Sequence, residues 1–441
     1  METILIRALQ LVLSLSLLVF IHEGGHFLFA KMFKIRVEKF RLFFDPWFTL
    51  FKYKPRNSDT EYGIGWLPLG GYVKIAGMID ESMDKEQLKQ APQPWEFRSR
   101  PPYQRLLVMV AGVLFNFLLA LFVYSMILLS WGDKYIPLQN MSHGMEFNEH
   151  AEKIGFRDGD ILLSADSVAF ERFGIDMLRT IVDAKEVVVL RAGEKKTVYM
   201  PELSLLTVTK EAHPFISIRI PAVVDSVYAN SAAERANLKK GDRLVALSGN
   251  KINSWNEFRA QLKQMKMDKN ASRSFELCVD RSGQMDTLQM QVDSTFTLGC
   301  LPQFMDYEPL VTTYTLFSSI PAGVKMGINT LKSYVNDMKY VFSKEGADSL
   351  GGFGTIASIF PAQWDWYRFW SMTAFLSIVL AFMNILPIPA LDGGHIFFLL
   401  IEMITRRTLS EKFMEYAQMA GMILLFGLLI WANLNDVLRL F

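Results

Sequence analysis

Residues 4–33 read ILIRALQLVLSLSLLVFIHEGGHFLFAKMF, an apolar run long enough to cross a lipid bilayer as a helix. Near its end stand His22, Glu23 and His26, in the pattern H-E-x-x-H. On a helix the two histidines share one face and can both ligate a zinc ion, while the glutamate reaches a metal-bound water. In hydrocarbon these polar side chains are costly unless they face a metal or a wet cavity. Function is the simplest reason for their presence there.

The composition indicates a membrane protein. The 441 residues have room for roughly two to four domains, and a mean hydropathy of +0.18 with 51% hydrophobic residues is too apolar for an average soluble protein. The formal net charge of +1 provides no global field for nucleic acid, so we expect no nucleic-acid partner. Two cysteines, Cys278 and Cys300, are too few for a disulfide scaffold, and a single bridge between them is left open.

The first twenty residues superficially resemble a signal peptide. A cleavable signal ends its apolar core at a small-residue site, whereas this apolar run continues through His22 to Phe33 without one. We therefore interpret the run as a retained spanning helix.

Three further segments reach membrane length, at 106–131, about 369–391 and about 417–434. The expected fold is a polytopic α-helical membrane protein with four transmembrane helices. By the positive-inside rule the segment between the first two spans is cytoplasmic and both termini lie outside. That segment is rich in cations, which are Lys31, Lys34, Arg36, Lys39, Arg41, Lys52, Lys54, Arg56, Arg98, Arg100 and Arg105.

Residues 34–75 alternate aromatic and polar side chains and end in a glycine-rich stretch with Gly70 and Gly71. This pattern favours strands over a helix. Because lipid does not tolerate an exposed sheet edge, such a sheet must enter a cavity lined by protein or lie at the membrane interface.

The long stretch after the second span contains an internal repeat. Aligning Gly159-Asp160 with Gly241-Asp242 also superposes Ala151 on Ala233, with an apolar strand after each pair. The short helix, Gly-Asp turn and strand look like a PDZ domain, a fold that pairs an extended peptide with a strand edge. We expect two such extracytoplasmic α+β modules, which either bind peptide or act as a size filter. Further on, helical spacing over 320–342 predicts an amphipathic helix near the membrane surface.

The expected parts therefore follow one another in a simple order. They are a first spanning helix (1–33), a cytoplasmic and re-entrant β region (34–105), a second span (106–131), two PDZ-like modules (132–208 and 212–296), a linker with the amphipathic helix (297–368), and two more spans (369–404 and 417–438).

A second polar cluster ends the third span, where residues 384–395 read NILPIPALDGGH. Asp392 offers a third metal ligand, and the prolines at 387 and 389 interrupt the helix so that the chain can turn toward the first span. The topology places Asp392 at the same membrane depth as His22. His395 could also approach a metal. The alternative is a histidine that serves only the start of the helix or an interface.

These motifs resemble the site-2 protease family of intramembrane zinc metalloproteases, and within it the regulator of sigma-E protease branch. The resemblance covers nearly the whole chain, although family Gly-Pro positions near Gly112 and Gly351 are replaced. It rests on His22-Glu-Gly-Gly-His26, Pro68-Leu-Gly-Gly-Tyr-Val-Lys74, Gly112-x-x-x-Asn116, the two repeats and Leu391-Asp-Gly-Gly394.

The resemblance implies that His22, His26 and Asp392 ligate Zn²⁺ and that Glu23 is the general base. Asn384 would match the family asparagine that holds the substrate or stabilises the oxyanion. Its alternative role is to bond backbone groups that the prolines leave free.

The resemblance also implies a substrate-binding region. Strands around 61–75, with Gly70 and Gly71, would match the membrane re-entrant hairpin that pairs with the substrate backbone. Asn116 is a further candidate for substrate binding, with helix packing as the equal alternative.

The implied activity is that of a zinc-dependent intramembrane endopeptidase in a bacterial inner membrane, with the termini and PDZ-like modules periplasmic and the active site toward the cytoplasm. The implied substrates are single-span membrane proteins in the lipid bilayer, namely an anti-sigma factor after a first-site cut, and remnant signal peptides. One alternative is a catalytically silent adaptor, against which the complete H-E-x-x-H and Asp392 argue. A metal transporter would need polar residues along several spans, and the second and fourth have few.

Overall fold

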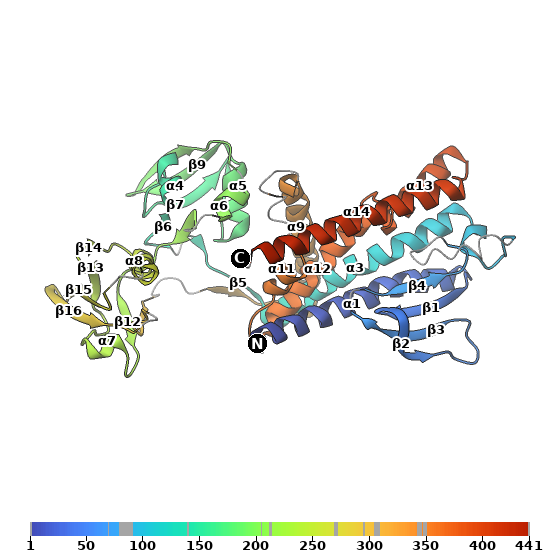
Figure 1. The fold of residues 1–441 in the computed structure, drawn as a ribbon. Coiled ribbons are helices and arrows are strands. Elements are labelled where there is room, and N and C mark those ends of the chain that lie inside the picture. The colour runs from blue at the N-terminus through green and yellow to red at the C-terminus, as the bar shows by residue number, and fades with distance from the viewer. Residues whose placement is uncertain are drawn as a thin grey trace. The chain divides into compact units, whose positions relative to one another are not determined.

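The computed structural model describes residues 2–68, 70–78, 91–138, 141–203, 205–210, 214–268, 272–293, 296–303, 309–341, 346 and 351–439. The chain divides into two compact units. Met1–Gly132 and Thr313–Phe441 form the membrane unit, and Asp133–Thr312 form the β-rich unit. Figure 1 follows the chain from α1 in blue to α14 in red.

Among the residues that the structure describes, the membrane unit contains 4 helices that are long and apolar enough to cross a bilayer, which agrees with the expected number of spans. They are α1 (Glu2–Met32), α3 (Pro102–Trp131), α12 (Trp366–Ile385) and α14 (Glu411–Leu438). Helix α3 packs against both α1 and α12, as Figure 1 also shows. A helix suits such a segment because it satisfies all backbone hydrogen bonds within the segment, as the interior of a bilayer requires.

The third membrane segment differs from the single stretch expected over 369–404. Helix α12 ends at Ile385, and a separate helix, α13, begins at Asp392 and runs to Thr405. The interruption contains Pro387 and Pro389, which have no N–H to continue the helical ladder and which disfavour helical backbone in the residue before them. The break therefore falls where the prolines predicted it, and it is a loop between two helices.

A four-stranded sheet follows α1 and has the order β2-β3-β1-β4. The strands are β1 (Val37–Leu42), β2 (Phe44–Tyr53), β3 (Glu61–Leu67) and β4 (Tyr72–Ile75). The hairpin expected over 61–75 does not form, because β1 lies between β3 and β4 and pairs with both. The hairpin is instead β2 with β3.

A buried arginine explains why β1 lies next to β3. Arg41 on β1 is 2% exposed. Its guanidinium donates to Asp45 Oδ2 at 3.0 Å and to the Glu61 carbonyl at 2.8 Å, and it also pairs with the Glu61 carboxylate. A buried guanidinium is stable only with such partners, so it ties β1 to the start of β2 and to β3.

The described part of the membrane unit also contains short helices and one long helix. They are the 3-10 turn η1 (Phe97–Ser99), α9 (Leu316–Val341) and α11 (Phe353–Ile359). The amphipathic helix expected over 320–342 is thus confirmed as a helix. It approaches α3 closely at Gly323, where an added Cβ would lie 2.3 Å from Ser125 Oγ.

The β-rich unit contains two successive repeats of one arrangement, as the sequence predicted. Each contributes a four-stranded sheet, with the orders β10-β9-β7-β8 and β14-β13-β15-β16. The first repeat comprises β6 (Met145–Phe147), α4 (Glu149–Ile154), β7 (Ile161–Ala165), β8 (Val168–Ala169), α5 (Ile175–Asp183), β9 (Glu186–Arg191), β10 (Glu194–Tyr199), α6 (Leu205–Lys210) and β11 (Ile216–Ile218).

The second repeat has the same order of strands and helices, except that the structure describes no helix between its last two strands, where the first repeat has α6. It comprises β12 (Val224–Val227), α7 (Ala232–Arg235), β13 (Arg243–Leu247), β14 (Asn250–Lys251), α8 (Trp255–Met267), β15 (Ser274–Arg281), β16 (Gln284–Gln291) and β17 (Cys300–Pro302). Two further strands, β5 (Asp133–Tyr135) and β18 (Leu310–Thr312), pair with each other. Both cysteines, Cys278 and Cys300, are free thiols.

The last strand of each repeat lies beyond the range expected from the sequence, which was 132–208 for the first repeat and 212–296 for the second. Strand β11 pairs with β6, and β17 pairs with β12. The closing strands are only three residues long and follow loops, so they carry too little hydrophobic alternation to be read from the sequence.

The aspartates of the two Gly-Asp turns make equivalent contacts in the two repeats. Asp160 receives two hydrogen bonds of 2.7 Å from Arg191 and one of 2.9 Å from the Arg157 N–H. Asp242 receives bonds of 2.8 and 2.7 Å from Arg281 and one of 2.8 Å from the Lys239 N–H. Both carboxylates are buried, so each links a turn to the end of a strand in its own repeat.

Replacing Asp242 by asparagine is expected to destabilise the second repeat by about 2 kcal/mol, because Arg281 loses its charged partner. Burial acts to raise the pKa of Asp242, but hydrogen bonds from Arg281 and the Lys239 N–H outweigh it and lower that pKa. A lowered pKa means that the carboxylate stabilises the fold above its unfolded-state pKa of about 4. This stabilisation is lost as the pH falls through the folded-state pKa.

Hydrogen exchange in the whole protein measures this effect. At pH 7, Asp242→Asn should accelerate exchange in β13 and β15. Acidification should have the same effect on the unsubstituted protein, after correction for intrinsic exchange rates. The matched control is Asp225→Asn, which removes an exposed ion pair with Lys240 and should change little. Unchanged protection in Asp242→Asn would contradict the structural role of the turn.

Candidate metal centre

Two histidines one turn apart on α1 begin the site. His22 and His26 are both buried, and their Nε2 atoms lie 3.3 Å apart. A spacing of four residues places them on one face of the helix, as the sequence predicted. His26 Nδ1 lies 2.9 Å from the Val108 carbonyl oxygen on α3. A carbonyl only accepts, so Nδ1 carries the proton and Nε2 presents a lone pair to the site.

The carboxylate of Asp392, in the first turn of α13, meets both histidines. Its Oδ2 atom lies 3.0 Å from His22 Nε2 and 3.2 Å from His26 Nε2. This oxygen is buried and accepts no conventional hydrogen bond. Convergence of a carboxylate oxygen with imidazole lone pairs is unfavourable unless a proton or a cation lies between them.

The donor set fits a divalent metal. The candidate ligand atoms of His22, His26 and Asp392 all lie within 4.8 Å of one another. Two imidazole nitrogens and one carboxylate oxygen form a common catalytic zinc set, which leaves a fourth position open. Within the part of the chain that the structure describes, this is the candidate ligand group, and His395 is not a member of it.

Two asparagines flank His22. The amide of Asn384, just before the end of α12, lies 3.4 Å from His22 Nε2, and the amide of Asn116 on α3 lies 3.3 Å from His22 Nδ1. Asn116 is fully buried, and its Oδ1 has no hydrogen-bond partner in this amide orientation. The opposite amide orientation lets Oδ1 accept from His22 Nδ1–H, which leaves the Nε2 lone pair for a metal.

Asn116 thus lies against a candidate ligand, and the substrate-binding role, which the sequence offered beside helix packing, stays a prediction. Its backbone carbonyl also accepts a 2.7 Å hydrogen bond from Ser377 on α12. The side chain of Asn116 is therefore placed to orient His22, and its backbone carbonyl joins α3 to α12.

Glu23 is oriented by the sheet. Its carboxylate accepts a hydrogen bond from the backbone N–H of Val73 on β4. Because β4 is an edge strand, its outward N–H groups have no partner strand within the sheet. The bond therefore brings the sheet edge next to the candidate metal ligands.

The close approach of α1 and α3 depends on small residues that the sequence analysis did not assign to the site. A Cβ on Gly112 would lie 2.3 Å from His26 Nε2 and 2.9 Å from His22 Cε1. A Cβ on Gly25 would lie 2.6 Å from the Ala111 carbonyl oxygen. Small residues allow close helix crossings in membranes, and the Gly-Gly and Ala-Gly pairs are the sequence signal for this crossing.

Gly70 and Gly71 lie next to β4 in closely packed surroundings. A Cβ on Gly71 would lie 2.5 Å from the Arg41 carbonyl oxygen and 2.8 Å from Val19 Cγ1 on α1. A Cβ on Gly70 would lie 2.7 Å from the Phe44 ring. These contacts explain the glycines by packing of the sheet against β1 and α1, and a role in substrate binding stays a prediction.

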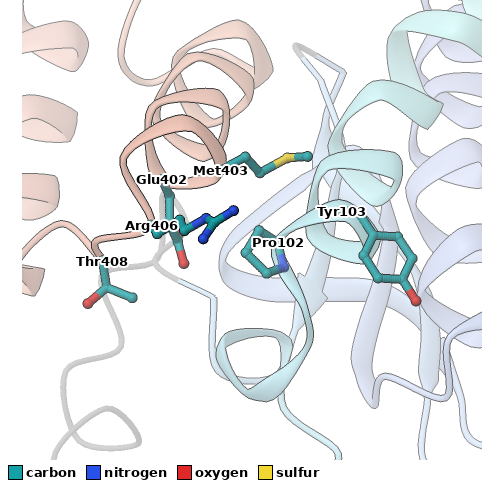
Figure 2. A pocket seen from close by; sticks show the side chains of 6 residues that line it. All are labelled: Pro102, Tyr103, Glu402, Met403, Arg406 and Thr408. Atoms are coloured by element: carbon teal, nitrogen blue, oxygen red, sulfur yellow. The ribbon is translucent and has the colours of Figure 1, made fainter.

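A separate pocket of about 340 Å³ lies at the other end of α13 (Figure 2). Glu402 in this pocket pairs with Arg105 at 2.6 Å. Glu402 lies ten positions after Asp392 on the helix, which is a distance of about 15 Å along the axis. The pocket is therefore remote from the candidate ligands. Its lining residues are Pro102, Tyr103, Glu402, Met403, Arg406 and Thr408.

Comparison with known proteins identifies the family. The model of Peptidase family M50 matches residues 10–428. The chain belongs to this family. The match includes His22, His26 and Asp392, and family membership confirms both the resemblance drawn from the motifs and the assignment as a peptidase.

Several full-length relatives support the same assignment. A protein of Salmonella typhi named "Regulator of sigma E protease" is 26% identical over 466 residues, which cover 100% of both chains. A Vibrio cholerae protein named "Putative zinc metalloprotease" is 27% identical over 471 residues, again 100% of both chains. A Neisseria meningitidis protein named "Putative zinc metalloprotease NMA0084" is 28% identical over 462 residues, 98% of this chain and 99% of that protein.

Proposed function

We propose that this protein is a zinc-dependent intramembrane endopeptidase that cleaves transmembrane segments of single-span membrane proteins. The observation that carries the proposal is the convergence of His22, His26 and Asp392 among apolar helices of membrane length. The names of two relatives as zinc metalloproteases support zinc as the metal. Two nitrogen ligands and one oxygen ligand support the same choice.

Glu23 has the position and chemistry of the general base. When bound, zinc would polarise the scissile carbonyl and make a water molecule more acidic. The Glu23 carboxylate then takes the proton of the attacking water and returns it to the leaving amide nitrogen. The Val73 N–H holds the carboxylate in place during both transfers.

The side chain of Asn384 is placed to stabilise charge on the substrate. Its amide lies beside His22 Nε2, and Asn384 is the residue before the last in α12, the helix that precedes the loop to Asp392. An N–H donor there can bond the oxygen of the scissile carbonyl as negative charge develops on it, an interaction stronger in the transition state than in the ground state.

The edge strand β4 offers a way to present the substrate. A peptide bond in a transmembrane helix is already hydrogen-bonded within the helix, so the segment must unwind before cleavage. Pairing of the unwound segment with β4 would satisfy its backbone groups in lipid, where an unpaired group is costly. Glu23, bonded to Val73 on this strand, would then lie next to the paired peptide.

The remaining parts of the proposal concern setting and access. The cationic segment between α1 and α3 supports a cytoplasmic position for the sheet, with the termini and the β-rich unit outside in a bacterial inner membrane. The names of sigma E regulators among the relatives support an anti-sigma factor as substrate. The two repeats of the β-rich unit would act as PDZ-like modules that control access to the site.

Metal removal tests the proposed function. Purified protein is dialysed against 1,10-phenanthroline and incubated with a model single-span peptide, and products are identified by mass spectrometry. Cleavage should fall below detection, return with stoichiometric zinc, and not return with magnesium, which prefers octahedral oxygen ligands. Cleavage by a preparation shown to be free of metal would overturn the proposal.

A further inference from the structure

The loop between α12 and α13 lies between two of the proposed site residues, Asn384 near the end of α12 and Asp392 at the start of α13. It is folded tightly, with Leu391 N–H donating to the Ile388 carbonyl at 3.1 Å. Within it, Ala390 has a φ of 78°. This left-handed conformation is unfavourable for a residue with a Cβ and persists only where surrounding contacts enforce it.

Two residues of α14 make contacts that enforce this conformation. The Ala390 N–H donates to Gln418 Oε1 at 3.3 Å. One turn later, a Cβ on Gly421 would lie 1.8 Å from the Pro389 carbonyl oxygen, so only glycine lets α14 approach the loop this closely. Both contacts fall on the two residues that directly precede Leu391 and Asp392.

The burial of Gln418 is unusual on this helix. In the most apolar stretch of α14 only 11% of the residues are buried, and Tyr416 and Ile423 are each 68% exposed. Gln418 is 5% exposed. A buried amide in an apolar setting is costly unless it is hydrogen-bonded, so its bond to the loop is the feature that justifies it.

We propose that Gln418 is a positioning residue for the metal site, holding the strained Ala390 backbone so that Asp392 reaches His22 and His26. The inference rests on the proposed function, because it gives α14 a role toward the same zinc. Without the bond, Ala390 can relax toward a favourable φ, and a change of backbone direction two residues before Asp392 displaces its carboxylate. A displacement near 1 Å is enough to spoil a ligand set.

The test compares zinc affinities of variants of the whole protein, measured by competition with a chromophoric chelator. Gln418→Leu keeps the size of the side chain and removes the acceptor, and its affinity should fall about 10- to 100-fold. Gln418→Glu keeps an acceptor oxygen, so its zinc affinity should stay within about threefold of that of the unsubstituted protein. Ile423→Ala alters a lipid-exposed position on the same helix and should change nothing.

The visible spectrum of the cobalt-substituted protein is the second readout, because it reports ligand geometry without activity. Gln418→Leu should alter this spectrum, whereas Gln418→Glu and Ile423→Ala should not. If Gln418→Leu elutes as a folded species and binds zinc as tightly as the unsubstituted protein, the inference is wrong. A failure of the unsubstituted protein to bind zinc would instead refute the proposed function. If Gln418→Leu does not fold, Gln418→Ala takes its place. The inference is then wrong if Gln418→Ala loses zinc affinity and Gln418→Glu, which keeps the acceptor oxygen, loses it as well.

Discussion

Substituting Glu23 by glutamine should reduce cleavage of a transmembrane peptide by about a thousandfold or more, while zinc affinity stays within about threefold. Glutamine has the size of glutamate, and its amide oxygen can still accept the Val73 N–H. It cannot take a proton from water near neutral pH. The substitution therefore removes proton transfer and leaves packing and the three proposed ligands in place.

Two measurements on the same preparations separate catalysis from assembly. Initial rates of peptide cleavage report the chemistry, and competition with a chelator reports the metal. Glu38→Gln is the matched control, since it neutralises a carboxylate on β1 that pairs with Lys74 at 3.4 Å. It should leave the cleavage rate nearly unchanged. Cleavage by Glu23→Gln within tenfold of the unsubstituted protein would remove Glu23 from the mechanism.

The ligand group was predictable because each step uses short-range sequence information. The spacing of His22 and His26 places both on one helix face, and the prolines before Asp392 indicate a change of chain direction. Topology then brings the two segments to one depth. The structure places these three residues together as expected, and their role as zinc ligands stays a proposal.

The order of the strands was not predictable in the same way. Reading residues 61–75 as a hairpin joins β3 to β4 as neighbours, which is the locally simplest connection. Arg41 makes that connection wrong, because its buried guanidinium needs the carboxylates of Asp45 and Glu61 and so places β1 next to β3. Such a long-range pairing leaves no periodic signal in the sequence.

The same limit applies to contacts between elements distant in the chain. The Gly-Asp repeats were recognised as turns, but nothing in their spacing named Arg191 and Arg281 as partners. Likewise Asn116 carried the signal of a polar residue in an apolar span, which indicates importance without saying what the side chain touches. Only the crossing of α1 and α3 shows that it meets His22.

Replacing Gly112 by alanine should lower zinc affinity by at least about a hundredfold and reduce cleavage below detection. A Cβ there would lie 2.3 Å from His26 Nε2, far inside van der Waals contact, and 2.9 Å from His22 Cε1. Neither imidazole can move away freely, since His26 Nδ1 bonds the Val108 carbonyl on the same helix as Gly112, and His22 Nδ1 meets the Asn116 amide on that helix. Either the helices separate or the rings rotate, and both outcomes displace ligand atoms.

Gly24→Ala provides the matched control, because this glycine lies within the H-E-x-x-H motif yet a Cβ on it meets nothing within 4 Å. Alanine also favours the helix by about 1 kcal/mol relative to glycine, so zinc affinity and cleavage should be retained. Chelator competition and peptide cleavage on both variants compare the same chemical change at two positions. If Gly112→Ala binds zinc as well as Gly24→Ala, the α1–α3 crossing does not determine the ligand geometry. If only Gly112→Ala loses zinc, the close helix approach is itself a requirement of the metal site.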